Sequence, residues 1–226
     1  CEVDLFYLAD NGVTIKAIDD AEVGMSQEFE GSEYTIVSEE QLREMVNNEE
    51  DLTYVVTSKV TTMENLFENK DVSGNISNWD TSKVTTMNFM FENSDFNGDI
   101  SNWDVSNVTD MTGMFLFSNF NGDISDWNTE QLKYADRMFM ESIFNQPIGD
   151  WNTSSIRKMN YMFYQSRFNQ PIGNWDVSSV EDMTFMFLGS QFNQPIGNWD
   201  VSNVIGMMGM FRATPFNQDV SNWNVG

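Results

Sequence analysis

Tryptophan recurs in this chain at one fixed interval. Consecutive tryptophans are 24 residues apart throughout, and the seven residues are Trp79, Trp103, Trp127, Trp151, Trp175, Trp199 and Trp223. A self-similar period between about 20 and 50 residues is typical of a solenoid, because each unit buries its apolar face only by stacking on its neighbours. The spacing therefore predicts a stack of coils, and function is to be sought on an extended, repetitive surface.

Other residue types keep the same register. A branched aliphatic residue lies three positions before each tryptophan, and a phenylalanine followed by an asparagine begins seven positions before it. Only the first copy departs from this pattern, with Val72 and Ser73 at the positions of the phenylalanine and the asparagine. We expect the tryptophans and isoleucines to form a buried column and the asparagines to satisfy backbone groups at a turn.

The segment after each tryptophan has the periodicity of a helix. After Trp103, the apolar residues Val108, Met111, Met114 and Phe115 follow one another at steps of three, three and one, which places them on one helical stripe. A serine precedes five of these stripes, where its hydroxyl can accept from the free N–H groups of a helix start; these are Ser82, Ser106, Ser154, Ser178 and Ser202. Each coil is therefore predicted to contain a very short strand near the Ile-x-x-Trp stretch and a helix of roughly ten residues.

The whole unit resembles a known bacterial repeat. The segments 192–204 and 108–115 are similar to the repeat of the BspA-like bacterial surface proteins, a family related to leucine-rich-repeat proteins, and the resemblance covers residues 55–226. It implies an α/β fold, a leucine-rich-repeat-like solenoid of strand-turn-helix coils. It also implies a role in surface binding or adhesion without a shared enzymatic activity. We expect residues 56–226 to form about seven such repeats.

Residues 1–55 are a different kind of sequence, and we expect a small α+β cap. The apolar runs 5–8 and 13–18 flank an Asn-Gly pair, a strong hairpin signal, and residues 34–37 have the composition of a third strand. Ser38 begins a capping box that leads into a helix of roughly ten residues. Residues 7–16 also resemble the leader found before such repeats in proteins of Bacteroidota. A cap of this kind hides the open end of a solenoid core.

The single cysteine, Cys1, opens the chain. A bacterial lipoprotein begins with a cysteine once its signal peptide has been removed, and Glu2 and Asp4 resemble the acidic export signal of surface lipoproteins in Bacteroidota. A triacylated cysteine would anchor the protein stably to a membrane. The alternative is a cysteine left by unrelated cleavage or cloning. We expect lipidation of Cys1 and a location on the cell-surface side of the outer membrane.

Charge and composition exclude several classes of function. The net charge of −24 repels nucleic acid and anionic lipid headgroups alike. Because the chain has no histidine and one cysteine, it lacks the usual general base, an imidazole ligand and a thiolate metal site. Clusters such as 121–123 and 102–104 offer oxygen ligands to calcium, but their spacing is not that of an EF-hand. We therefore expect no enzyme, no catalytic residue, no metal site and no cofactor apart from the N-terminal lipid.

The tenth residue after each tryptophan is the candidate contact position. It falls almost opposite the apolar stripe of the expected helix, so it should face outward. Its occupants are Phe89, Gly113, Arg137, Tyr161, Phe185 and Gly209. Aromatic residues and arginine are enriched in interface cores, so Phe89, Arg137, Tyr161 and Phe185 are predicted to contact a protein partner. The alternative is chance decoration of a solvated face.

Two functions remain open at this stage. We expect a non-enzymatic, lipid-anchored scaffold for protein–protein interaction, acting as an accessory subunit of an outer-membrane complex, with a membrane β-barrel as one possible partner. The alternative is a glycan-binding or adhesive module, which exposed tryptophans would favour because their rings could stack on sugars. A hydrolase is disfavoured because the residues for its chemistry are missing.

Overall fold

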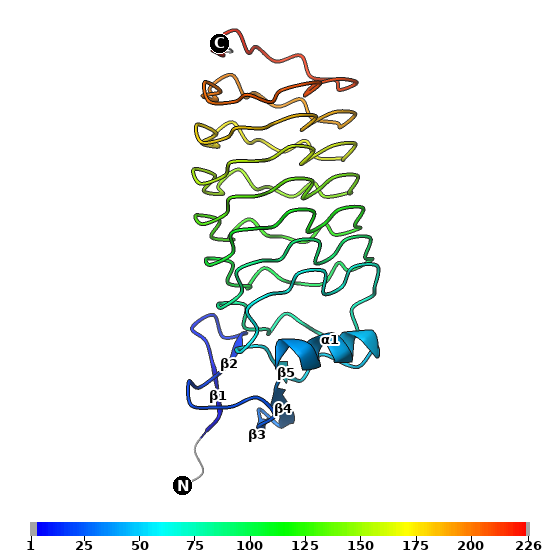
Figure 1. Cartoon of the computed structure of the whole chain (residues 1–226), viewed down its shortest axis with the longest axis vertical. Helices are drawn as coiled ribbons and strands as arrows, with labels where there is room; N and C mark the ends of the chain where they lie inside the picture. Colours follow the sequence, from blue (N-terminus) through cyan, green and yellow to red (C-terminus); the bar gives the residue numbers. More distant parts are fainter. Residues whose placement is uncertain (1–3, 225–226) are drawn as a thin grey trace.

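The computed structural model describes residues 4–224. In Figure 1 the chain runs along its long axis, from a small N-terminal region that contains every labelled helix and strand to a series of coils stacked one above another. We call these coils the coil stack. The two ends of the described chain therefore lie at opposite ends of an elongated molecule.

The N-terminal region begins with the expected hairpin. β1 (Phe6–Leu8) pairs antiparallel with β2 (Ile15–Ala17), and this confirms the prediction made from the Asn-Gly pair. Phe6 and Ile15 are buried in a small apolar cluster with Ile36. The tight turn is closed by the side chain of Asn11, whose Oδ1 accepts from the backbone N–H of Val13 and that of Thr14 at 3.0 Å.

A second sheet connects this region to the coils. β3 (Ser26–Phe29) is antiparallel to β4 (Ser32–Ile36), and β4 is parallel to β5 (Val55–Val56). The predicted strand at residues 34–37 therefore belongs to β4. β5 leads directly into the first coil, so the sheet and the coil stack are continuous along the chain.

The helix α1 (Glu39–Asn47) closes one end of the apolar core. Its N-terminus has the predicted capping box, because Ser38 Oγ accepts from the backbone N–H of Gln41 and Gln41 Oε1 accepts from that of Ser38. Leu42 and Val46 are its buried residues, and both belong to the same apolar cluster as the interior of the coils. The helix thereby shields the first coil from water.

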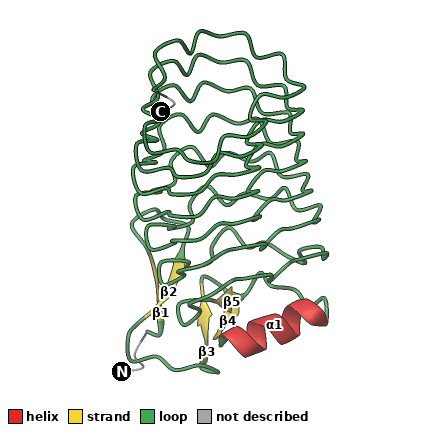
Figure 2. Cartoon of the chain, turned by 45° about the horizontal axis from the view of Figure 1, so that its top comes forward, coloured by secondary structure: helices red, strands yellow, loops and turns green. Residues whose placement is uncertain are grey.

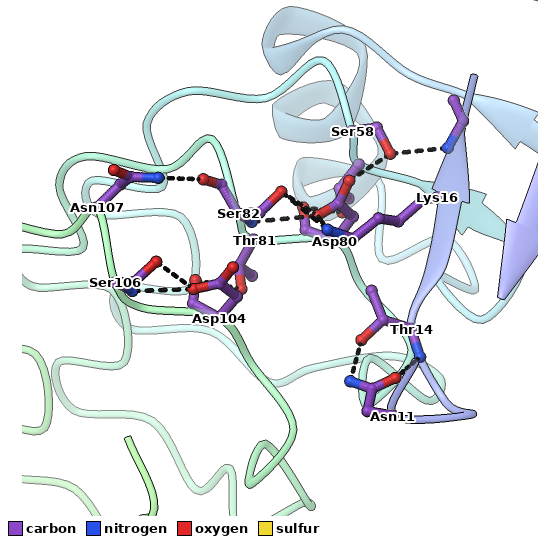
Figure 3. Close-up of polar contacts among 12 residues, drawn as sticks. Asn11, Thr14, Lys16, Ser58, Asp80, Thr81, Ser82, Asp104, Ser106 and Asn107 are labelled. Carbon is purple, nitrogen blue, oxygen red and sulfur yellow. Dashed lines mark hydrogen bonds and ion pairs between the residues drawn. The ribbon is translucent and has the colours of Figure 1, made fainter. Parts of the chain in front are cut away.

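A buried aspartate fixes the hairpin to the side of the first coil (Figure 3). Asp80 is 4% exposed and accepts from Ser58 Oγ at 2.6 Å, while Lys16 Nζ lies 3.7 Å from its other oxygen. Ser58 Oγ in turn accepts from the backbone N–H of Ala17 at 3.0 Å. Further along the hairpin, Asn11 Nδ2 donates to the carbonyl of Asn102, the residue before Trp103. A displaced hairpin would leave the buried Asp80 carboxylate without Lys16, and an unpaired buried charge is strongly destabilising. These contacts therefore hold the hairpin in one position.

Backbone hydrogen bonds join each coil to the next with a shift of 24 residues. The parallel bridges between coils pair Thr62 with Thr86, Thr86 with Asp110, and so on to Asp182 with Gly206. After each bridge, every second backbone N–H donates to a carbonyl of the next coil. Met87 N–H is bonded to the Asp110 carbonyl at 2.9 Å and Phe89 N–H to the Thr112 carbonyl at 2.8 Å. Every residue in this segment therefore lies over its counterpart in the neighbouring coil.

The predicted helix in each coil is wrong, and so is the predicted short strand near the Ile-x-x-Trp stretch, because the bridges between coils lie after the tryptophan instead, as at Thr86 and Asp110. Figure 2 shows the coils as loop, and within residues 58–224 the segments after the tryptophans form turns. The bonds within a coil span three residues, as from Met90 N–H to the Met87 carbonyl at 3.2 Å. Coils joined by backbone bonds lie about 4.8 Å apart, whereas a helix with its side chains is about 10–12 Å wide. A helix in every coil would not fit this stacking, although three-residue turns bury the same stripe.

The predicted helix-capping serines have another role. After Trp103, the backbone N–H and the hydroxyl of Ser106 both donate to Asp104 Oδ1, at 3.0 and 2.6 Å. The same arrangement joins Ser178 to Asp176. The aspartate directly after the tryptophan thus closes a local turn, which is a common use of this residue type. The serine caps nothing, because no helix follows it.

Aromatic columns fill the interior, as the spacing of the sequence predicted. Trp79 and Trp103 are stacked with their ring planes 1° apart and their centroids 6.2 Å apart. Each indole Nε1 donates to the carbonyl of the residue 27 positions earlier, which for Trp103 is Ile76 at 3.1 Å. The six tryptophans from Trp79 to Trp199 are at most 3% exposed. The prediction of a buried tryptophan column is therefore confirmed for these six.

An asparagine ladder satisfies the backbone at one corner. Asn97 Oδ1 accepts from the backbone N–H of Asn121, and Asn121 Oδ1 accepts from that of Asn145, both at 2.8 Å. The same bond continues through Asn169 and Asn193. The predicted role of these asparagines is confirmed, and the ladder explains why an amide follows each phenylalanine.

Truncation of one tryptophan tests the column. Trp151 is 3% exposed, is stacked on Trp127 and donates to the Ile124 carbonyl at 3.0 Å. Because a large cavity would remain, we expect Trp151→Ala to lower the free energy of unfolding by about 3–5 kcal/mol, measured by urea denaturation. Trp151→Phe, which keeps an apolar ring and loses the hydrogen bond, should have a smaller effect. An unchanged unfolding midpoint for Trp151→Ala would contradict the column.

Candidate functional site

The tenth residue after each tryptophan has an unusual backbone conformation. Arg137, Tyr161 and Phe185 have φ angles of 56°, 58° and 55°, and Phe89 has 53°. Each is the third residue of a four-residue turn, where a left-handed residue is required, as shown by the bond from Met90 N–H to the Met87 carbonyl around Phe89. We call these positions, from Phe89 to Gly209, the tenth-position column. Their direction is set by the turn and not by a helical face.

Three of the four predicted contact residues come together. The guanidinium carbon of Arg137 lies 5.7 Å from the centroid of the Tyr161 ring, and the rings of Tyr161 and Phe185 are 5.2 Å apart with a 54° tilt. Arg137 is exposed, whereas Tyr161 and Phe185 are half-buried. Tyr164, which the sequence analysis did not select, adds a ring 5.7 Å from that of Tyr161. The result is a continuous patch of an arginine and three aromatic rings.

Phe89 lies apart from this patch. Its ring covers Gly113 of the next coil so closely that a Cβ on Gly113 would meet ring carbons at 2.4 Å. The ring of Phe185 covers Gly209 in the same way, at 2.5 Å. The side chains of Phe89 and Phe185 therefore pack over the tenth-position residue of the next coil. In both cases that residue is a glycine, which has no side chain to clash with the ring. Gly113 separates Phe89 from Arg137.

A buried carboxyl group lies beside the patch. Asp136 precedes Arg137, and its Oδ1 is buried without a hydrogen-bond partner within the described part of the chain. Burial raises the pKa of this carboxyl to about 6, although Lys158 lowers it and the neighbouring Asp182 and Asp110 raise it further. A protonated carboxyl would be the favoured form in weakly acidic solution.

Three other features were considered as sites: a cavity, the acidic side chains and the tryptophans. A cavity of about 490 Å³ lies between the end of α1 and the first coil, where Val72 and Ser73 replace the phenylalanine and asparagine of later coils. Across residues 4–224, no group of three or more acidic or cysteine side chains is placed to hold a metal ion. The tryptophans from Trp79 to Trp199 are buried, so these rings offer no stacking platform for sugars.

Comparison with known families places the chain. The family model described as "Mycoplasma protein of unknown function, DUF285" matches residues 37–143 and 137–226. The chain belongs to the DUF285 family. DUF285 is a repeat family related to the BspA-like surface repeat proteins, and the two matches together include α1 and the coil stack. The searches of curated proteins and of solved structures gave no match.

The predicted lipid anchor stays a prediction. Cys1, the predicted lipidation site, lies outside the described residues of this DUF285 chain. No helix found between residues 4 and 224 has the length and apolarity needed to cross a membrane.

Substitution at Gly113 tests the packing along the tenth-position column of this DUF285 chain. Gly113 has a φ of 61°, and an added Cβ would clash with the Phe89 ring. A left-handed non-glycine residue costs about 1–2 kcal/mol, so Gly113→Ala should lower the free energy of unfolding by at least that amount. Phe89→Ala in the same chain should recover the steric part of this loss. If Gly113→Ala unfolds at the same urea concentration as the wild type, Phe89 does not pack on Gly113.

The carboxyl of Asp136 should make stability depend on pH. Its folded-state pKa is raised to about 6 from an ordinary value of 3.8, so its contribution to stability is fully present below about pH 4 and is lost as the pH rises through 6. Relative to the wild type, Asp136→Asn should therefore be stabilising by about 1–2 kcal/mol at pH 7.5, once solvent screening is allowed for, and near neutral at pH 4. Urea denaturation at several pH values measures this.

The matched control for this experiment is Asp126→Asn, which removes one negative charge from an exposed corner. The difference in free energy of unfolding between Asp136→Asn and the wild type should grow with pH. The corresponding difference for Asp126→Asn should not show this growth. A pH-independent difference at Asp136 would show that its carboxyl is not perturbed by burial.

Proposed function

We propose that this protein is a non-enzymatic, surface-exposed scaffold for protein–protein interaction. In this proposal it has the role of a BspA-like surface protein and acts as an accessory subunit of an outer-membrane complex. The observation that supports it best is the patch formed by Arg137, Tyr161, Tyr164 and Phe185. Arginine and aromatic side chains on a rigid scaffold are the residue types that dominate binding energy at protein interfaces.

The scaffold supports this use of the patch. The residues of the patch are on adjacent coils whose backbones are bonded to each other, as from Tyr161 N–H to the Thr184 carbonyl at 2.9 Å. The Arg137 guanidinium is already held against the Tyr161 ring. A partner would therefore meet side chains that lose little conformational freedom on binding, which favours affinity.

Replacement of two aromatic residues tests the proposed interface. Tyr161→Ser with Phe185→Ser should weaken binding of the partner by more than about 2 kcal/mol if both are hot spots. The partner would be captured from native membranes on the immobilised full chain, identified by mass spectrometry and then titrated in purified form. Unchanged circular dichroism would show that the fold is intact.

Tyr7→Ser with Phe117→Ser is the matched control, because these side chains are 48% and 44% exposed and lie outside the patch. The control should bind as the wild type does. Equal binding by the Tyr161 and Phe185 variant would place the partner elsewhere on the molecule. Capture of glycans instead of protein would support the adhesive alternative.

A further inference from the structure

One coil reverses the charge of the protein. The unit 151–174 contains Arg157, Lys158 and Arg167 and no acidic residue, so its net charge is +3. The other five complete units between residues 79 and 222 have net charges of −3, −4, −2, −3 and −1 in chain order. In a chain of net charge −24, a basic unit between acidic ones is a local feature that binding could use.

The fold adds two more cations to this coil. The backbone N–H of Arg157 donates to the carbonyl of Lys133 at 2.9 Å, so these residues are stacked in adjacent coils. Lys158 is paired with Tyr134 through the parallel bridge between the same coils. Arg137 contributes the guanidinium that lies over Tyr161, in the coil of Lys158. We call the four exposed side chains Lys133, Arg137, Arg157 and Lys158 the basic face.

Most of the acidic groups around the basic face are less exposed than its cations. Glu181 forms an ion pair with Arg157 at 3.5 Å, but both side chains are half-exposed or more, and such pairs contribute little. Asp136 is half-buried beside Lys158, and Asp110 and Asp182 lie near it. Burial raises the pKa of Glu92, Glu68 raises it further, and Arg137 offsets part of this rise. Of these acidic side chains only Glu181 is exposed, whereas Asp110, Asp136 and Asp182 are half-buried, so the charge that a ligand meets at the basic face is mainly that of its four cations.

Aromatic side chains accompany these cations. Tyr134 is 39% exposed and is bridged to Lys158, and Tyr161 is half-buried beneath Arg137. Cations beside tyrosine rings fit a ligand that combines carboxylates with an apolar or aromatic group. The acidic units on both sides, 103–126 and 175–198, would repel a long polyanion that extends along the coil stack. The face therefore suits a short anionic segment.

We propose that the basic face, with Tyr134 and Tyr161, binds a short acidic segment of a partner protein in which carboxylates flank an aromatic or apolar residue. This inference rests on the proposed function and adds the chemistry of the partner. The acidic remainder of the surface repels such a segment, so it binds in one place. Repulsion elsewhere then contributes to specificity as much as attraction at the face does.

Charge reversal on the full chain tests this inference. The probes are fluorescent peptides in which Asp and Glu flank a Tyr or Phe, and the same peptides with Asn and Gln in place of the acids. The wild type should bind the acidic set in preference to the amide set, with affinity that falls as salt is raised. Arg157→Glu with Lys158→Glu should weaken this binding by about tenfold or more in fluorescence anisotropy titrations.

Lys83→Glu with Arg212→Glu is the matched control, because it makes the same change in net charge at two exposed residues away from the basic face. Its affinity should remain within about twofold of the wild type. If the Arg157 and Lys158 variant fails to fold by circular dichroism, Arg157→Gln with Lys158→Gln replaces it, with the same direction of effect. Equal binding of acidic and amide peptides by the wild type would overturn the inference.

Two further outcomes separate this inference from the proposed function. If a captured membrane partner binds the Arg157 and Lys158 variant as well as the wild type but is lost by the Tyr161 and Phe185 variant, the scaffold function stands and the basic face does not. If the wild type binds a sulfated polysaccharide or phosphatidylserine vesicles and none of the acidic peptides, the inference about the basic face fails, while the proposed function is still decided by capture of a protein partner and its loss in the Tyr161 and Phe185 variant.

Discussion

Backbone hydrogen bonding between coils is the constraint on which the rest of this structure depends. Because Met87, Phe89 and Phe91 all donate to the next coil, successive coils are held at the spacing of neighbouring strands. At that distance each coil must follow the path of the one before it. The 24-residue period of the sequence follows from this, since an insertion within a coil would break the ladder on both sides.

The side-chain columns follow from the same spacing. Rings at identical positions in adjacent coils are stacked, as for Phe115 and Phe139, which are 5.6 Å apart with planes 6° from parallel. Polar groups solve a second problem, because a coil of turns leaves many backbone groups without the bonds of a helix or sheet. Tryptophan Nε1 atoms and asparagine Oδ1 atoms bond to backbone groups of the neighbouring coil, so the interior has few unsatisfied groups.

The coils differ in charge at positions that this constraint leaves free. The sixth, seventh and tenth residues after tryptophan face outward or lie at turns, and there the units differ in charge and size. Arg137 and Tyr161 meet because they occupy the same position in adjacent coils. A surface of this kind can change its partner by single substitutions without altering the fold.

The sequence alone determined the period, the buried tryptophan column, the asparagine ladder, the hairpin β1–β2 and the capping box of α1, because each depends on local chemistry or on exact repetition. It did not determine the conformation after each tryptophan, since the stripe of Val108, Met111 and Met114 fits both a helix and a series of turns. The distance between coils decided in favour of turns. Tertiary structure likewise decided that Phe89 packs on Gly113 while Arg137, Tyr161 and Phe185 contact one another. Such contacts depend on the direction in which each turn points its side chain, and the sequence pattern does not specify that direction.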